Sequence, residues 1–417
     1  MNLRKIADRA SGLVDQGLFS LSTMGQLLIY ARVLPKDDFG LFSLAWGTCM
    51  VALGLHRSVV VLPMIVTAGQ HFHLEGGIWT RIDLLFRLLL AGGLLVAAAV
   101  AHVVAPEQDY ALLFGLTAPA VAASLAYEFQ RRCLFQLARR REVVIASAVQ
   151  ASAILVSIIV VTQLKPDETA AILGYAAAST VAALVARFLR GPLLWQAGER
   201  VITLLRTNRA MMTWNLLSYI PYAVYYNAMV LIVGIVSGAL GAAAFSAARI
   251  FAAPITTLIQ AVDSVDKPRA RAALREKGNP GLRRALGRTR RSFLLLGAPY
   301  LLLVVIAGPY LVPLVLGPSF ADLYVAVAVW MGVLLLMLIA FPMETGLVLL
   351  QKSNLVFWVR TAAAVTSLAT YLAVNGHAGH TAPVIGLLAG WSVSTILSWI
   401  FLERSLKAAA AATGGQP

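Results

Sequence analysis

Two arginines fall deep inside long apolar stretches of the chain, where a charged side chain is costly. Arg57 lies within the apolar run 40–66, and Arg249 lies about ten residues into the run 240–262. A charge at the bilayer centre costs about 2.5–3.5 kcal/mol on insertion scales, so such residues usually face a cavity or a partner. Because a guanidinium donates paired hydrogen bonds to phosphate, both are candidates for anion binding, with a buried ion pair as the alternative. Arg32 is a third candidate, although it lies near the end of its run and can extend to the interface.

Polar and aromatic side chains share one helical face within the apolar run 212–236. Their spacing is four, three and four residues, and they are Asn215, Tyr219, Tyr222 and Tyr226. This spacing places them on one side of an α-helix, which Pro221 is expected to kink. Such a face suits stacking on sugars and hydrogen bonding to them, and the alternative is a belt of tyrosines at the membrane interface. Gln26 belongs to a comparable polar face of the first apolar run, with Asp15 and Ser22.

Two carboxylates are candidates for binding a proton or a cation. Glu344 has no cation within one helical turn in the sequence, and Asp15 lies near the start of the first apolar run. A charge at the membrane interface is an equally good interpretation of Asp15. Glu128, by contrast, has Arg131 and Arg132 within one turn, so we interpret it as a salt bridge at the membrane rim.

Composition indicates a membrane protein. Of the 417 residues, 59% are hydrophobic and only 13% are charged, whereas soluble domains carry about 25% charged residues. The formal net charge is +15, but the basic residues form short clusters between apolar runs and no nucleic-acid-binding module is visible. The two cysteines and six histidines show no metal-site or disulfide spacing, and we expect no metal and no cofactor.

The apolar runs predict an all-α membrane protein with twelve transmembrane helices, since about 20 apolar residues cross a bilayer. The first six are at 13–34, 40–66, 84–105, 110–130, 143–164 and 170–189. The second six are at 212–236, 240–262, 292–316, 323–350, 357–375 and 383–402. The tightest turns are expected at Pro35–Phe39 and at Gly238–Gly241.

The distribution of basic residues predicts the orientation. With the N-terminus in the cytoplasm, 28 of the 34 Lys and Arg fall in predicted inside segments and 2 in outside loops. This bias follows the positive-inside rule and places both termini in the cytoplasm. The longest inside loop, 263–291, is basic and suits the surface of anionic lipid.

The halves of six helices predict two bundles related by a parallel repeat. We expect an N-terminal bundle at 1–190, a basic interfacial linker at 191–211 and a C-terminal bundle at 212–417. A short sequence similarity between the halves supports the repeat. The similar segments are Phe39–Ala45, which opens the second span, and Ala242–Ala248, which opens the eighth.

The first 70 residues or so contain a series of short motifs. They are Asp15-Gln16, Ala31-Arg32-Val33-Leu34-Pro35 and Phe39-Gly40-Leu41-Phe42, followed by Arg57 and Pro63. This series resembles the start of polysaccharide flippases (the Wzx type, which exports O-antigen units), which belong to the multidrug/oligosaccharidyl-lipid/polysaccharide exporter superfamily. It implies a V-shaped pair of six-helix bundles around a central cavity that opens alternately to the cytoplasm and the periplasm. It also implies an inner-membrane flippase for an undecaprenyl-diphosphate-linked oligosaccharide, used in lipopolysaccharide or exopolysaccharide synthesis.

Two alternatives remain open at this stage. A drug/cation antiporter of the same superfamily would share the architecture, but it would favour an acidic cavity over Arg57 and Arg249. A membrane-embedded polysaccharide-synthesis enzyme is disfavoured, because the outside loops are short and no nucleotide-sugar or Gly-Lys-Ser/Thr motif is present. We therefore expect no enzyme activity, a monomer, a lipid-linked oligosaccharide and membrane lipids as ligands, and a polysaccharide polymerase with chain-length machinery as partners.

Overall fold

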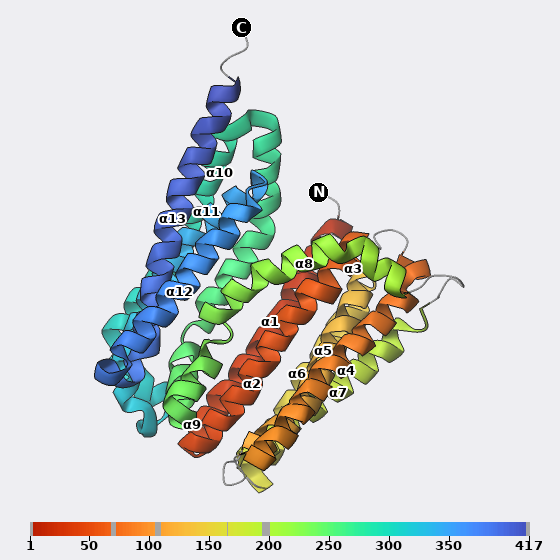
Figure 1. The fold of residues 1–417 in the computed structure, drawn as a ribbon, viewed down its shortest axis with the longest axis vertical. Coiled ribbons are helices and arrows are strands. Elements are labelled where there is room, and N and C mark those ends of the chain that lie inside the picture. Colours follow the sequence, from red (N-terminus) through yellow and green to blue (C-terminus); the bar gives the residue numbers. More distant parts are fainter. Residues whose placement is uncertain (1–2, 68–71, 105–109, 165, 194–200, 414–417) are drawn as a thin grey trace. The chain divides into compact units, whose positions relative to one another are not determined.

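The structure is a computed structural model, and it describes residues 3–67, 72–104, 110–164, 166–193 and 201–413 (Figure 1). The described residues are almost all helical and contain no β-strand. The helices of the first half are α1 (Leu3–Val33), α2 (Lys36–His56), α3 (Leu62–Thr67), α4 (Phe72–Val104), α5 (Tyr110–Gln136), α6 (Arg140–Leu164) and α7 (Glu168–Arg190). Those of the second half are α8 (Val201–Tyr225), α9 (Met229–Ile250), α10 (Ala253–Leu316), α11 (Tyr324–Leu349), α12 (Ser353–Ala378) and α13 (Ala382–Thr413).

Shorter helical turns join some of these helices. A π-helical segment, η1 (Arg57–Val61), connects α2 to α3 without a break. The 3₁₀ segments η3 (Pro318–Leu323) and η4 (Gly379–Thr381) precede α11 and α13. The predicted all-α fold is confirmed, and each of the twelve predicted spans falls on one or two of these helices.

Nine helical runs within the described residues are long and apolar enough to cross a membrane. Three of them contain 50, 64 and 56 residues, and each includes an interruption. The interruptions are a turn at Tyr226–Ala228 with a non-helical Gly238, a non-helical Gly278, and η4. The turn predicted at Gly238–Gly241 is present, because Gly238 has φ 70°. The span predicted at 212–236 is divided between two helices, since α8 ends at Tyr225, one turn after Pro221, and α9 begins at Met229.

Apolar side chains cover much of the outer surface. On α4 the exposed residues include Leu85, Leu88, Leu89, Val96 and Val103. A soluble protein rarely exposes an apolar surface of this extent, whereas a lipid bilayer accommodates it. The chain is a multi-pass membrane protein.

The chain divides into two compact units, residues 1–223 with 230–243 and residues 224–229 with 244–417. Part of the predicted linker 191–211, residues 194–200, lies outside the described residues, and 201–211 form the start of α8.

Helices of unit 1 pack along their lengths, with α5 in contact with α2, α4 and α7, and α6 in contact with α1 and α7. The first part of α9 lies against α2 at glycines. A methyl group on Gly40 would lie 2.1 Å from the Ala239 carbonyl oxygen, and one on Gly47 would lie 2.4 Å from Val230 Cγ1. These close approaches require the absence of a side chain.

Unit 2 is built on α10, α11, α12 and α13, with α13 packed against both α11 and α12. At one end, Leu282 and Leu286 of α10 pack with Leu347 of α11 and Leu402 and Leu406 of α13.

Candidate functional site

Glu128 on α5 is the centre of a charged network in unit 1. Its side chain is 3% exposed and pairs with three arginines. Oε1 accepts hydrogen bonds from Arg57 Nε at 2.8 Å and from Arg132 Nε at 2.9 Å, and Oε2 accepts one from Arg131 Nη2 at 2.8 Å. The predicted pairing with Arg131 and Arg132 is present, and the carboxylate is buried inside the protein.

Arg131 forms the buried half of this network. Its side chain is 2% exposed, and Nη1 donates to both carboxylate oxygens of Asp15 at 3.2 and 3.1 Å. Asp15 also accepts a hydrogen bond from Ser147 on α6, whose hydroxyl lies 3.0 Å from that of Tyr127. The guanidinium carbon lies 5.3 Å from the ring centre of Phe19. With every charged group partnered, this half joins α1, α5 and α6, so a structural role stands beside the coupling role predicted for Asp15.

Arg57 and Arg132 form the accessible half. Their side chains are 45% and 31% exposed. Both use Nε to reach the same Glu128 oxygen, so their guanidinium groups are neighbours. Within the described part of the chain, their terminal nitrogens make no other hydrogen bond. Among the residues that the structure describes, three guanidinium groups share two carboxylates, which leaves one positive charge in excess. Two adjacent guanidinium groups with unused N–H donors suit an anion with several oxygens, such as phosphate.

The segment that carries Arg57 has an uncommon geometry. π-Helical turns are rare and frequently occur at functional sites, and η1 begins at Arg57 itself. The preceding residue, His56, is fully buried and its Nε2 lies 2.9 Å from Asp83 Oδ1 on α4. Asp83 also pairs with Arg87 at 2.7 Å. Consecutive residues therefore attach the chain to two helices, His56 to α4 and Arg57 to α5.

The polar face of α8 contacts α2 and the following η1 segment within unit 1. Asn215 Nδ2 donates to the Ser58 carbonyl at 3.4 Å, and the Tyr219 hydroxyl donates to the Val51 carbonyl at 3.2 Å. The Tyr219 ring covers Gly54, where a methyl group would lie 2.0 Å from it. Tyr222 lies beside Tyr219, with 6.5 Å between ring centres. Asn215 and Tyr219 thus hold α8 against the helix that presents Arg57.

Tyr226 and Arg249 come together in unit 2. Tyr226 lies in the turn after α8, so it does not continue the helical face of Tyr219 and Tyr222. The Arg249 guanidinium carbon is 4.8 Å from the Tyr226 ring centre, and Nη2 lies 3.4 Å from Asn227 Oδ1. A cation over an aromatic face is a stable arrangement, and here it fixes the half-buried Arg249.

Glu344 forms an ion pair with an arginine that lies beyond one helical turn in the sequence. Arg360 on α12 donates to Glu344 Oε2 from Nη2 at 2.8 Å and from Nε at 3.3 Å. Ser394 on α13 lies 3.5 Å from Oε1. The Glu344 side chain is 7% exposed. This pair connects α11, α12 and α13, so a structural role now stands beside the coupling role predicted for Glu344.

The two remaining candidates of the first helix lie in different environments. Gln26 is buried beside Tyr30, whereas Arg32 is exposed at the end of α1. Neither belongs to the Glu128 network.

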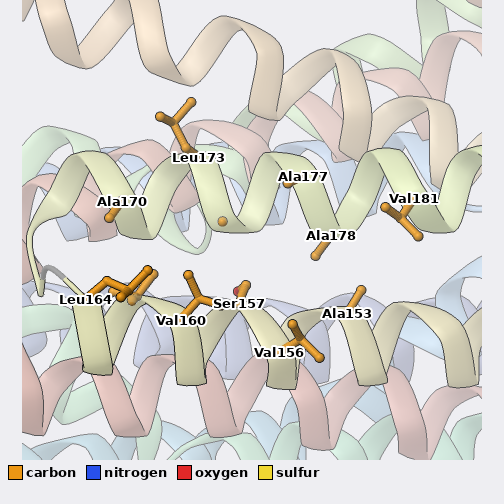
Figure 2. A pocket seen from close by; sticks show the side chains of 12 residues that line it. Ala153, Val156, Ser157, Val160, Leu164, Ala170, Leu173, Ala177, Ala178 and Val181 are labelled. Atoms are coloured by element: carbon orange, nitrogen blue, oxygen red, sulfur yellow. The ribbon is translucent and has the colours of Figure 1, made fainter.

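A lateral groove lies between α6 and α7 (Figure 2). Its volume is about 750 Å³, and Ser157 is the single hydroxyl-bearing residue among the 12 that line it. Leu164 and Ala170 lie on the two helices near one end, and Val156 and Val181 lie toward the other (Figure 2). Walls of this kind exclude a charged group and accept hydrocarbon.

Comparisons with known proteins support the fold. No protein-family model matches the chain, and no curated protein matches it. Among solved structures, the lipid II flippase MurJ in an inward closed conformation has a TM-score of 0.70 at 9% identity, covering 96% of this chain and 89% of that one. An inward-facing multidrug resistance MATE family transporter of the MOP superfamily has a TM-score of 0.69 at 14% identity, covering 93% and 94%.

A third similar structure is a MOP superfamily transporter from Pyrococcus furiosus, for which a reversed polarity of the binding pocket suggests a different function. Its TM-score is 0.63 at 14% identity, covering 96% of this chain and 94% of that one. The chain therefore has the fold of MATE and MurJ transporters.

Proposed function

We propose that this protein is a flippase that carries a lipid-linked oligosaccharide across the bacterial inner membrane by alternating access. The cargo is an undecaprenyl-diphosphate-linked repeat unit, moved from the cytoplasmic to the periplasmic leaflet for O-antigen or exopolysaccharide synthesis. The protein acts as a monomer and not as an enzyme, and it delivers cargo to a polymerase with its chain-length machinery.

The Arg57–Glu128–Arg132 arrangement is the observation that carries this proposal. It presents two adjacent guanidinium groups, 45% and 31% exposed, with one uncompensated positive charge. A diphosphate has enough oxygens to accept hydrogen bonds from both guanidinium groups. A cationic drug would be repelled by the same surplus charge.

The position of these arginines fits capture from the cytoplasm. By the positive-inside rule, the end of α3 and the end of α5 face the cytoplasm. Arg57 lies ten residues before Thr67, the last residue of α3, which is about 15 Å along a helix. The head group would therefore meet these arginines after entering the membrane from the inside.

The lipid tail of such a cargo also requires an apolar environment, and the apolar surface of the protein provides one. An amphiphile with a long isoprenoid tail keeps that tail in hydrocarbon while its head group passes through the protein. The groove between α6 and α7 shows that the surface offers hydrocarbon-lined recesses. The similarity to a structure described as a lipid II flippase supports a lipid-linked cargo.

Reconstituted vesicles provide the test. Purified protein is placed in liposomes with an undecaprenyl-diphosphate oligosaccharide, and a membrane-impermeant enzyme that modifies the sugar reports how much cargo has reached the outer leaflet. Losing a charge-assisted hydrogen bond costs about 1.5–3 kcal/mol, so Arg57→Ala and Arg132→Ala should each slow translocation about tenfold or more. Arg139→Ala is the matched control, because Arg139 is exposed and donates to the Leu189 carbonyl outside the network.

The outcome distinguishes the proposal from the antiporter alternative. The similarity to a multidrug transporter makes a cationic dye the appropriate competing cargo in the same vesicles. Dye movement with unchanged lipid distribution, or full lipid translocation by the Arg57→Ala/Arg132→Ala double variant, would refute the flippase proposal.

A further inference from the structure

The long helix α10 forms an arm that extends beyond its apolar segments. Its 64 residues are interrupted at Gly278, which has φ 58° and ψ −153°. This left-handed backbone conformation suits glycine. A methyl group on Gly281 would lie 2.4 Å from the Ala273 carbonyl oxygen, so the chain turns back closely on itself. The arm is defined here as residues 266–291, and its turn lies within α10 (Figure 1).

Contacts inside unit 2 hold the arm in place. The Thr289 hydroxyl donates to Asp266 Oδ2 at 2.8 Å, which joins the outgoing and returning halves. Arg283 Nη2 donates to both carboxylate oxygens of Glu403 on α13 at 3.1 and 3.2 Å. Leu282 and Leu286 are buried against α11 and α13. The arm is therefore a packed element, and its surface has a defined shape.

The outgoing half of the arm carries a cationic groove. Its volume is about 660 Å³, and it is lined by Lys267, Pro268, Arg271, Ala272, Arg275, Glu276 and Leu349. The three basic residues are four positions apart, so they follow one face of the helix. Glu276 is the one acid among these lining residues. Asp266, an acid next to Lys267, already accepts hydrogen bonds from Thr289 and Arg269.

The groove combines cationic and apolar side chains, and a phospholipid likewise combines an anionic phosphate with an apolar tail. Arg271 and Arg275 provide guanidinium donors, while Leu349, Pro268 and Ala272 provide an apolar wall. A soluble anion would use only the cations. A phospholipid uses both, because its phosphate meets the arginines and its glycerol and first methylene groups meet the wall.

The location of the groove agrees with a lipid ligand. Lys267 follows the apolar run 240–262 by five residues, so the groove begins about one turn past the hydrocarbon edge. Basic clusters at the cytoplasmic surface attract anionic lipids, and the charge distribution of the chain assigns this arm to the cytoplasm.

We propose that the groove of Lys267, Arg271, Arg275 and Leu349 binds the phosphate of an anionic phospholipid at the cytoplasmic surface of the membrane. The lipid is a phosphodiester of the phosphatidylglycerol type, held in a site separate from the Arg57–Glu128–Arg132 arrangement. This binding does not depend on the identity of the transported cargo.

The test uses the full chain in phosphatidylcholine nanodiscs with increasing phosphatidylglycerol and no cargo. Native mass spectrometry then counts the phosphatidylglycerol molecules retained per protein. Arg271→Gln/Arg275→Gln should weaken retention roughly thirtyfold, because each of the two basic residues near the surface contributes about 1 kcal/mol. Arg284→Gln/Arg288→Gln is the matched control, because it removes the same charge from exposed positions of the returning half, outside the groove.

Unchanged retention in Arg271→Gln/Arg275→Gln would overturn the proposal. An equal loss in both double variants would also overturn it, since it would indicate general attraction to a basic surface. Displacement of the lipid by inorganic phosphate at similar concentration would assign the groove to a soluble anion instead. Equal melting temperatures of both double variants in pure phosphatidylcholine establish that each is folded.

Discussion

Arg131 and Arg57 contact the same carboxylate, and the structure predicts different consequences of their removal. Loss of Arg131 should lower stability, whereas loss of Arg57 should impair translocation. Arg131→Met removes the three hydrogen bonds that Nη1 and Nη2 make to Asp15 and Glu128 while keeping most of the side-chain volume. Glu128 retains Arg57 and Arg132. Asp15 is 4% exposed and retains only the Ser147 hydroxyl among the described contacts.

The expected cost follows from the charge that is left buried. Removing one partner of a buried ion pair costs about 3–5 kcal/mol, and we expect the lower end, about 3 kcal/mol, because Ser147 still donates to Asp15. Arg57→Met is different, since its side chain is 45% exposed. An exposed pair contributes about 0.2–1 kcal/mol, so Arg57→Met should leave stability nearly unchanged while slowing translocation about tenfold or more.

The free energy of unfolding in mixed detergent micelles, followed by tryptophan fluorescence, measures both effects. A double variant, Asp15→Asn/Arg131→Met, separates the cost of the unpaired Asp15 charge from the cost of the altered side-chain packing. Neutralising Asp15 removes the unpaired charge, so the double variant should recover about 2 kcal/mol relative to Arg131→Met alone.

Two results would contradict this reasoning. If Arg131→Met lost less than about 1 kcal/mol, the buried half would behave like an exposed pair. If Asp15→Asn added its own loss to that of Arg131→Met, the two side chains would not be coupled as their 3.1 Å contact requires.

Three further experiments test other contacts by the same unfolding measurement. Gly40→Ala brings a methyl group within 2.1 Å of the Ala239 carbonyl and should cost about 1–3 kcal/mol. Gly92→Ala, which meets nothing within 4 Å, should be neutral or stabilising, and equal losses would refute the packing argument. Arg360→Met should destabilise unit 2 by leaving Glu344 buried and unpaired, and adding Glu344→Met should restore much of the loss; a further loss would show that the pair is not coupled. Gly238→Ala adds a side chain at φ 70° and should cost about 1–2 kcal/mol, and an unchanged unfolding energy would contradict the need for glycine at that turn.

Sequence alone predicts the helices and most of their ends, because these depend on local properties. Twenty or so apolar residues define a span, and glycine or proline marks a turn. The join at Pro35–Phe39 follows this logic, since α1 ends at Val33 and α2 begins at Lys36. The break at Tyr226–Ala228 was missed because the residues there are compatible with a helix, and Pro221 indicated a kink without its exact consequence.

The contacts of the candidate site were less accessible from sequence. Arg57 and Glu128 are 71 residues apart, and Arg131 and Asp15 are 116 apart. No local pattern in a single chain reveals such pairs. The spacing of Glu128 with Arg131 and Arg132 was visible and predicted their pairing correctly. It did not reveal that the carboxylate is buried, because burial depends on α1, α2 and α6 folding around it.

The π-helical turn that begins at Arg57 affects how this chain can be compared with its relatives. A turn closed by i→i+5 hydrogen bonds holds one residue more than an α-turn. A homologue with a regular helix there would reach the same buried position as Met64 with one residue fewer. A gap-free alignment would then place a wrong residue opposite either Arg57 or Met64. Searches for an equivalent cation in distant homologues should therefore allow a one-residue offset between positions 56 and 62.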